Sequence, residues 1–328
     1  MVKAPRLRES RKAKALRVFQ AYGPVILLII FAAVVAALNP RFLSATNLVN
    51  ISMQIVPVGI ISLGLMFVII SGGIDLSAGF GTALCIVCTG IVFGVTKNIV
   101  LSIIASIAVG VVIGNVNAAF VTRVGIQPFI VTLAMMSVAQ GLTQILATGQ
   151  IVFFNHPFLS FLGRSRFLSV PVSAIFLVLL YVIGYLILNY TKLGAYTYAL
   201  GDNEESARLA GIPVLRYKTI LYILSGVCMG LAAIVIISRV ALVAANLAGI
   251  SLLLDAVASV ILGGANVNGG SGTIQGTFIG VVLVGMISNA LNLLNVPPVF
   301  QDVFKGSVII LALYYQVLTK PTRTLLRT

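Results

Sequence analysis

The chain has 328 residues, of which 59% are hydrophobic and only 9% are charged, with a mean hydropathy of +1.13 and a net charge of +14. A soluble domain carries roughly 25% charged residues, so this composition excludes the soluble classes and indicates a membrane protein.

Ten apolar segments are expected to form membrane helices, because about 20 residues of helix cross a hydrocarbon core of about 30 Å. A transmembrane barrel would instead show alternating strands of about 10 residues. The sequence therefore predicts an all-α, polytopic fold with about ten transmembrane helices. The ten segments span residues 22–38, 48–70, 78–95, 99–121, 128–148, 172–190, 219–238, 250–264, 273–295 and 303–318.

The basic residues are distributed unevenly along the chain. Seven of the 21 precede the first apolar segment, and Lys320, Arg323 and Arg327 follow the last. By the positive-inside rule, both termini are cytoplasmic and the number of spans is even. We expect basic tails at residues 1–19 and 319–328 that contact anionic lipid rather than nucleic acid, around one transmembrane domain at 20–318. The first apolar segment is expected to be an uncleaved anchor rather than a signal peptide.

Two glycine-rich breaks, residues 71–79 and 262–270, each follow an apolar run. Aligned on their glycine pairs, residues 70–79 and 261–270 match at four positions, which indicates two related halves. Non-helical backbone at membrane depth must be buried in protein or line a cavity, and such breaks in two halves point to a substrate path. The residues assigned to a path or gate on this basis are Gln54, Ser71, Gly72, Gly73, Asp75, Ser77, Asp255, Gly263, Gly264, Asn289 and Asn292.

Five polar side chains in this set, two acids and three amides, each have two interpretations. An acid inside the membrane is costly, so Asp75 and Asp255 are expected either to line the path or to cap and anchor helices. The amides of Gln54, Asn289 and Asn292 would form interhelical hydrogen bonds or bind a neutral, hydroxyl-rich substrate.

A polar island, Lys192–Lys218, interrupts the apolar sequence and contains three of the seven acids. It is long enough for a short helix of its own, and we expect a soluble partner to bind there. Ala207 and Gly211 are four residues apart, so Ala207 is expected at the partner contact, while Gly211 is expected to cap the end of the helix.

Enzymatic and metal-binding functions have little support in this sequence. Cys85 and Cys88 lie in an apolar helix without a second pair, and the single histidine, His156, cannot form a metal site. The sequence contains no G-x-x-x-x-G-K-[ST] phosphate loop. We therefore expect no catalytic residue, no metal and no cofactor in this chain.

Four stretches resemble motifs of the permeases of ribose-type ABC sugar importers. Residues 71–79 (SGGIDLSAG), 198–212, 262–277 and 289–294 match that family's patterns in order along the chain. Ser206 and Ala210 depart from the family's cytoplasmic loop, and residues 252–255 lack an acid expected before Leu-Asp. Because this last stretch lies near the expected path, the substrate need not be ribose itself.

The resemblance implies a permease in the bacterial inner membrane that works with a second permease subunit, identical or different. Two ATP-binding cassette domains would bind ATP and Mg, and a periplasmic sugar-binding protein would deliver the substrate. Coupling to the ATPase would involve Gly201, Asn203, Glu204, Ala207, Arg208 and Gly211. The alternatives are a permease for branched-chain amino acids or a furanose-like signal molecule, or an ion-coupled secondary transporter using Asp75 and Asp255.

Overall fold

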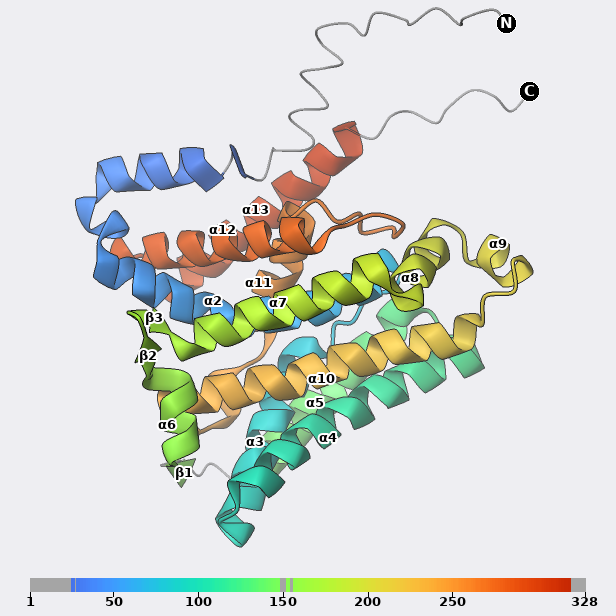
Figure 1. Ribbon diagram of the computed structural model, residues 1–328, viewed down its shortest axis with the longest axis horizontal. Helices are drawn as coiled ribbons and strands as arrows, with labels where there is room; N and C mark the ends of the chain where they lie inside the picture. The colour runs from blue at the N-terminus through green and yellow to red at the C-terminus, as the bar shows by residue number, and fades with distance from the viewer. Residues whose placement is uncertain (1–24, 27, 148–151, 154–155, 320–328) are drawn as a thin grey trace, which may run out of the picture.

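The computed structural model describes residues 25–26, 28–147, 152–153 and 156–319. The basic tails predicted at 1–19 and 319–328 lie outside the described residues, apart from Thr319. The described part is a bundle of long helices with two small β-ladders (Figure 1). The helices are Leu28–Leu38, η1 (Pro40–Leu43), α2 (Ala45–Ile70), α3 (Ala78–Thr96), α4 (Ile99–Ala119), η2 (Phe120–Val124), α5 (Pro128–Ala147), α6 (Pro157–Arg164), α7 (Val172–Tyr190), α8 (Lys192–Asp202), α9 (Glu204–Leu209), α10 (Val214–Val240), η3 (Ala245–Leu247), α11 (Ile250–Leu262), α12 (Ile274–Leu293) and α13 (Pro298–Thr319).

All ten expected apolar segments coincide with helices over their described residues. Eight helical stretches in this part of the chain are long and apolar enough to cross a membrane, and Leu28–Leu38 is a shorter apolar helix. The tenth segment lies within α13. The protein is therefore an all-α, polytopic membrane protein, as the composition predicts.

The centre of the bundle is formed by α2 and α10. In the most apolar 18-residue stretch of each helix, 83% of the residues of α2 and 72% of those of α10 are buried. The same share is only 22–28% for α4, α5 and α7, so these three helices lie on the outside of the bundle. A Cβ at Gly110 of α4 would lie 2.0 Å from the carbonyl oxygen of Gly226 on α10, and the reverse distance is the same. Small residues thus let α4 and α10 pack backbone against backbone, as is common in membranes.

The two ends of the bundle differ. One end, here called the island end, carries α8, α9 and the segment 263–273 between α11 and α12 (Figure 1). The other end carries α6 and the short strands: β1 (Val152–Phe153) pairs with β4 (Leu242–Val243), and β2 (Arg166–Phe167) pairs with β3 (Val170–Pro171).

Both glycine-rich breaks begin with the same helix-ending turn. Gly72 and Gly264 have φ of +81° and +89°, and each donates its N–H to the carbonyl three residues back at 2.9 Å. The following residues, Gly73 and Ala265, donate to the carbonyl five residues back, which completes a Schellman motif. Gly72 therefore corresponds to Gly264, so the alignment on glycine pairs is wrong by one residue.

The breaks also differ in burial. In the first, Gly72 is exposed but Ser71, Gly73, Asp75 and Ser77 are buried, so most of its non-helical backbone is covered by protein. The second exposes several residues at the island end, among them Gly264, Asn268 and Ser271.

Candidate functional site

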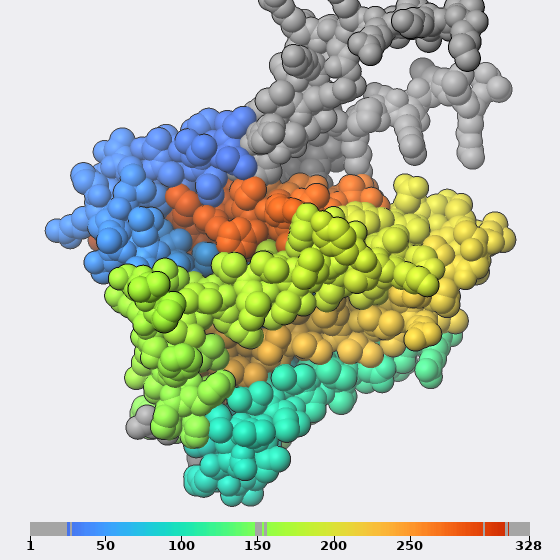
Figure 2. Space-filling view, in the orientation of Figure 1, coloured from blue at the N-terminus to red at the C-terminus, as the bar shows by residue number. Residues whose placement is uncertain are grey.

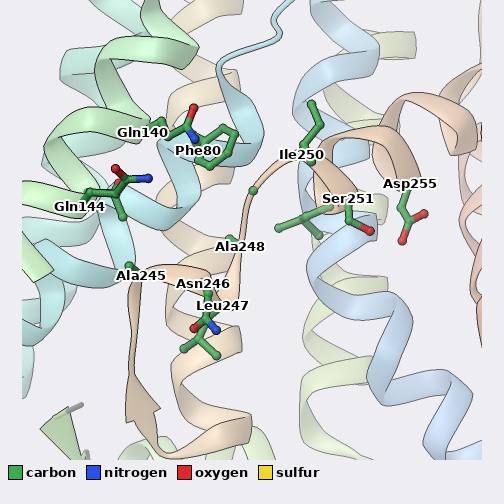
Figure 3. Close-up of a pocket in the computed structure, with 13 residues that line it drawn as sticks. Phe80, Gln140, Gln144, Ala245, Asn246, Leu247, Ala248, Ile250, Ser251 and Asp255 are labelled. Carbon is green, nitrogen blue, oxygen red and sulfur yellow. The ribbon is translucent and has the colours of Figure 1, made fainter. Parts of the chain in front are cut away.

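A cavity of about 570 Å³ opens between α3, α5 and the start of α11 (Figure 3). One wall is the irregular segment between β4 and α11, which follows the end of α10 and contains η3. The lining residues are Phe80, Gln140, Thr143, Gln144, Ala245, Asn246, Leu247, Ala248, Gly249, Ile250, Ser251, Leu252 and Asp255.

Polar groups face each other across this cavity. Gln140 and Gln144 come from α5, and Ser251 and Asp255 come from α11 on the opposite side (Figure 3). Amides and hydroxyls both donate and accept hydrogen bonds, and Phe80 adds an aromatic surface. Such a mixture suits a small, hydroxyl-rich solute with one apolar face.

Asp255 is paired with Lys305 of α13 at 2.9 Å. Their side chains are only 13% and 11% exposed, so loss of either charge would leave the other buried without a partner. The pair leaves the cavity edge polar without a net charge. Sequence reasoning identified Asp255 but not Lys305, whose only signal was a cation inside the apolar segment of α13.

Asp75 lies elsewhere and does not line the cavity. It is fully buried, and its Oδ1 accepts hydrogen bonds from the Ser77 backbone N–H at 3.1 Å and hydroxyl at 2.5 Å. Its Oδ2 accepts from the hydroxyl of Ser225 on α10 at 2.7 Å, and Asn117 of α4 donates to Oδ1 at 3.4 Å. Asp75 thus holds the first break against two helices, which favours the anchor interpretation for this acid.

The three amides predicted for the path lie in different places, away from the cavity. Asn289 and Asn47 exchange two buried hydrogen bonds of 2.8 and 3.0 Å that join α12 to α2. Asn292 accepts from Gln301 at 2.9 Å. Gln54 is half-buried in α2. None of the three predicted amides is among the residues lining the cavity, and for Asn289 and Asn292 the interhelical account applies.

The glycines and serines of the breaks lie at the helix ends rather than around the cavity. Ser71 donates its hydroxyl to Val68 O at 2.7 Å, within its own helix end. A Cβ at Gly263 would lie 2.5 Å from the carbonyl oxygen of Gly276, so this glycine lets α11 approach α12. Neither glycine pair lines the cavity.

The polar island contains the expected short helix, α9, which forms a corner with α8 at one edge of the molecule (Figure 2). Asn203 caps its start by accepting from Ser206 N–H at 2.8 Å. Gly211, at φ +82°, follows its end, where Ile212 donates to Ala207 O at 3.1 Å. The predicted cap at Gly211 is confirmed.

Ala207 does not face outward as predicted. It is 5% exposed and packs against Leu200 and Val214, where α8, α9 and α10 meet. The outward apolar side chains are Leu209, which is 81% exposed, and Leu215, which is 55% exposed. Sequence reasoning missed both, although an apolar residue in a polar island is itself a signal.

Charged residues of the island pair with one another on the surface. Glu204 contacts Lys218 and lies 3.4 Å from Arg208, which also lies 3.0 Å from Glu205. The side chain of Arg208 is 58% exposed, so its two pairs contribute only about 0–1 kcal/mol each. The pair of Glu204 with Lys218 is partly buried, since the Lys218 side chain is 13% exposed.

Comparison with known proteins gives one family and several named relatives. Residues 47–313 match the family described as branched-chain amino acid transport system / permease component. The chain is 42% identical over 300 residues to the ribose import permease protein of Bacillus subtilis (strain 168), covering 90% of this chain and 92% of that protein. It is 37% identical over 292 residues to the ribose import permease protein of Escherichia coli (strain K12), covering 88% and 91%. It is 31% identical over 299 residues to the L-arabinose transport system permease protein of the same strain, covering 91% of each. The resemblance predicted from the four motifs is confirmed.

Proposed function

This chain belongs to the family of branched-chain amino acid transport system permease components, and we propose that it forms the path by which an ATP-driven importer carries a pentose or similar small polyol. It is a multi-pass membrane permease subunit, and such subunits act with ATPase and substrate-binding partners. The relatives named for ribose and L-arabinose support a sugar as the substrate.

The lining of the cavity is the observation that carries this proposal. Gln140, Gln144 and Asn246 supply amides, Ser251 supplies a hydroxyl, and Asp255 is already neutralised by Lys305. A neutral polyol exchanges its water for these groups without bringing a charge into the membrane. The sequence departures at residues 252–255 lie on α11 beside this cavity, so they would adjust which sugar passes.

A branched-chain amino acid is the second candidate, because the family description names that substrate class. Its ammonium and carboxylate groups would have to compete for Asp255 and Lys305, which bind each other at 2.9 Å. The uncharged amides of α5 favour the sugar.

The partners proposed for this subunit follow from its two ends. A second permease subunit, identical or different, would complete the path. Two cytoplasmic cassette domains would bind ATP and Mg and hydrolyse ATP, while a periplasmic protein delivers the sugar. The island end and both termini would face the cytoplasm, where exposed Leu209 and Leu215 offer apolar surface for a cassette to cover.

The test is uptake by proteoliposomes that contain this chain, its ATPase subunits and its binding protein. We expect uptake of labelled ribose or arabinose that requires ATP, stops with vanadate and persists with an ionophore. Excess leucine should not compete. Uptake of leucine instead would favour the second candidate, and uptake that collapses with the ionophore would indicate a secondary transporter. Leu209→Asp should release the ATPase subunits during purification, whereas Glu204→Ala should not.

A further inference from the structure

The end of α8 meets both glycine-rich breaks at one point of the island end. A Cβ at Gly201 would lie 1.8 Å from the carbonyl oxygen of Ile70 and 2.4 Å from the amide nitrogen of Gly270. The same carbonyl accepts a hydrogen bond from Gly270 N–H at 2.9 Å. Three segments far apart in the sequence therefore touch backbone to backbone, and only glycine fits at position 201.

Further contacts fasten α8 to the second break. A Cβ at Gly269 would lie 2.9 Å from the carbonyl oxygen of Gly201 and 2.9 Å from Cα of Gly72. Tyr198, one turn before Gly201, donates its hydroxyl to Gly272 O at 2.7 Å. Partial burial raises the pKa of this phenol, so it keeps the proton that it donates.

The contact of Tyr198 and Gly201 with the two breaks is called the junction below. On its outer side, the junction is continuous with α9. One residue, Asn203, connects α8 to α9, and Leu200, Ala207 and Val214 form a small core beneath the corner. Packed side chains resist deformation, so α8 and α9 move together.

On its inner side, the junction is continuous with the cavity. The second break begins where α11 ends, and α11 has 13 residues, a length of about 20 Å. The opposite end of α11 carries Leu252 and Asp255 of the cavity lining. Oγ of Ser62 on α2 also lies 3.2 Å from Ala256 O on α11, so the two helices are in contact next to Asp255.

We propose that Gly201 and Tyr198 are positioning residues that transmit movement of the α8–α9 corner to the cavity through the two breaks and α11. Direct backbone contact leaves no side chain to absorb a displacement, so a shift of α8 moves the end of α2 and the segment 269–270 with it. That segment is tied to the end of α11 by backbone hydrogen bonds from Gly269 N–H to Asn266 O at 2.9 Å and from Ala265 N–H to Val260 O at 3.2 Å. This proposal rests on the function proposed above and identifies where ATP hydrolysis is coupled to transport inside this subunit.

The experiment compares sugar uptake with ATP hydrolysis in the same reconstituted complex. Gly201→Ala adds an atom to occupied space, and Tyr198→Phe removes one hydroxyl without adding volume. The matched controls are Gly94→Ala, where a Cβ meets nothing within 4 Å, and Tyr196→Phe on the same helix. The measured quantity is sugar transported per ATP hydrolysed in the presence of the binding protein.

We expect Gly201→Ala to lower this ratio by roughly tenfold and Tyr198→Phe by roughly two- to fivefold, with ATP hydrolysis retained. Both controls should keep the wild-type ratio. A purely structural role would lower uptake and hydrolysis in proportion and leave the ratio unchanged.

The outcomes separate this proposal from the proposed function. If the wild-type complex transports no sugar, the proposed function fails before any variant is compared. If the wild type transports sugar and Tyr198→Phe keeps its ratio, the proposed junction is overturned. Should Gly201→Ala fail to yield folded protein by gel filtration, Tyr198→Phe alone decides.

Discussion

Asp75 and Asp255 are both acids set in apolar sequence, yet the fold compensates them in different ways. Asp75 is surrounded by uncharged donors, Ser77, Asn117 and Ser225, deep between α3, α4 and α10. Asp255 lies at the cavity and relies on one cation, Lys305. A carboxylate held by several neutral donors fixes the backbone in place. One held by a single cation at a cavity edge depends on that cation alone.

The largest effect is expected for Asp75→Ala. The hydroxyls of Ser77 and Ser225 and the backbone N–H of Ser77 would lose their acceptor, and each buried, unpaired donor costs about 1–3 kcal/mol. Most of the protein should therefore fail to fold, which folded yield by gel filtration and thermal unfolding in detergent would measure. Asp75→Asn keeps one acceptor oxygen and should lose less. Stable Asp75→Ala protein without transport would place this acid on the path and remove the contrast with Asp255.

A smaller effect, on uptake rather than on folding, is expected for the Asp255–Lys305 pair. Removing one partner of a largely buried pair leaves an unpaired charge, which costs about 3–5 kcal/mol, whereas neutral replacement of both costs much less. Lys305→Met should therefore reduce uptake strongly, and Asp255→Asn combined with Lys305→Met should recover a large part of it. A double-mutant cycle on uptake measures this coupling. Additive losses would mean that the two charges act independently.

The smallest effect is expected for the amides on the opposite wall of the cavity. Gln144→Ala removes one hydrogen-bonding group from a path that contains several, so the KM for uptake should rise about three- to tenfold with normal folded yield. Ser137→Ala, an exposed position on the same helix α5, is the control and should leave the KM unchanged. An unchanged KM in Gln144→Ala would show that the sugar passes only along the side of Asp255.

The helices were predictable because length and hydropathy are local properties. All ten apolar segments coincide with helices in the described residues, and the short helix of the island and its cap at Gly211 were also anticipated. Glycine pairs indicated where α2 and α11 end, although the position of Gly72 in its turn corresponds to that of Gly264 rather than Gly263. A sequence alignment compares residue types, whereas the turn depends on which residue adopts positive φ.

The candidate site was only partly predictable. Of the path residues proposed from the sequence, Asp255 lines the cavity, while the glycines and Asn289 lie at helix ends and helix contacts. Gln140 and Gln144 were missed because nothing in α5 distinguishes an amide facing a cavity from one facing another helix. The outward face of α9 was misjudged at Ala207, since helical spacing gives a face but not its direction.

The amino-acid sequence by itself determined that this is a helical membrane protein with a polar island and two glycine-ended helices. Those features depend on composition and on short-range backbone chemistry. Only the tertiary structure decided that Asp255 meets Lys305, 50 residues away, and that Gly201 touches both Ile70 and Gly270. Such contacts depend on how whole helices pack in space, and the packing arises from many residues at once rather than from any one motif.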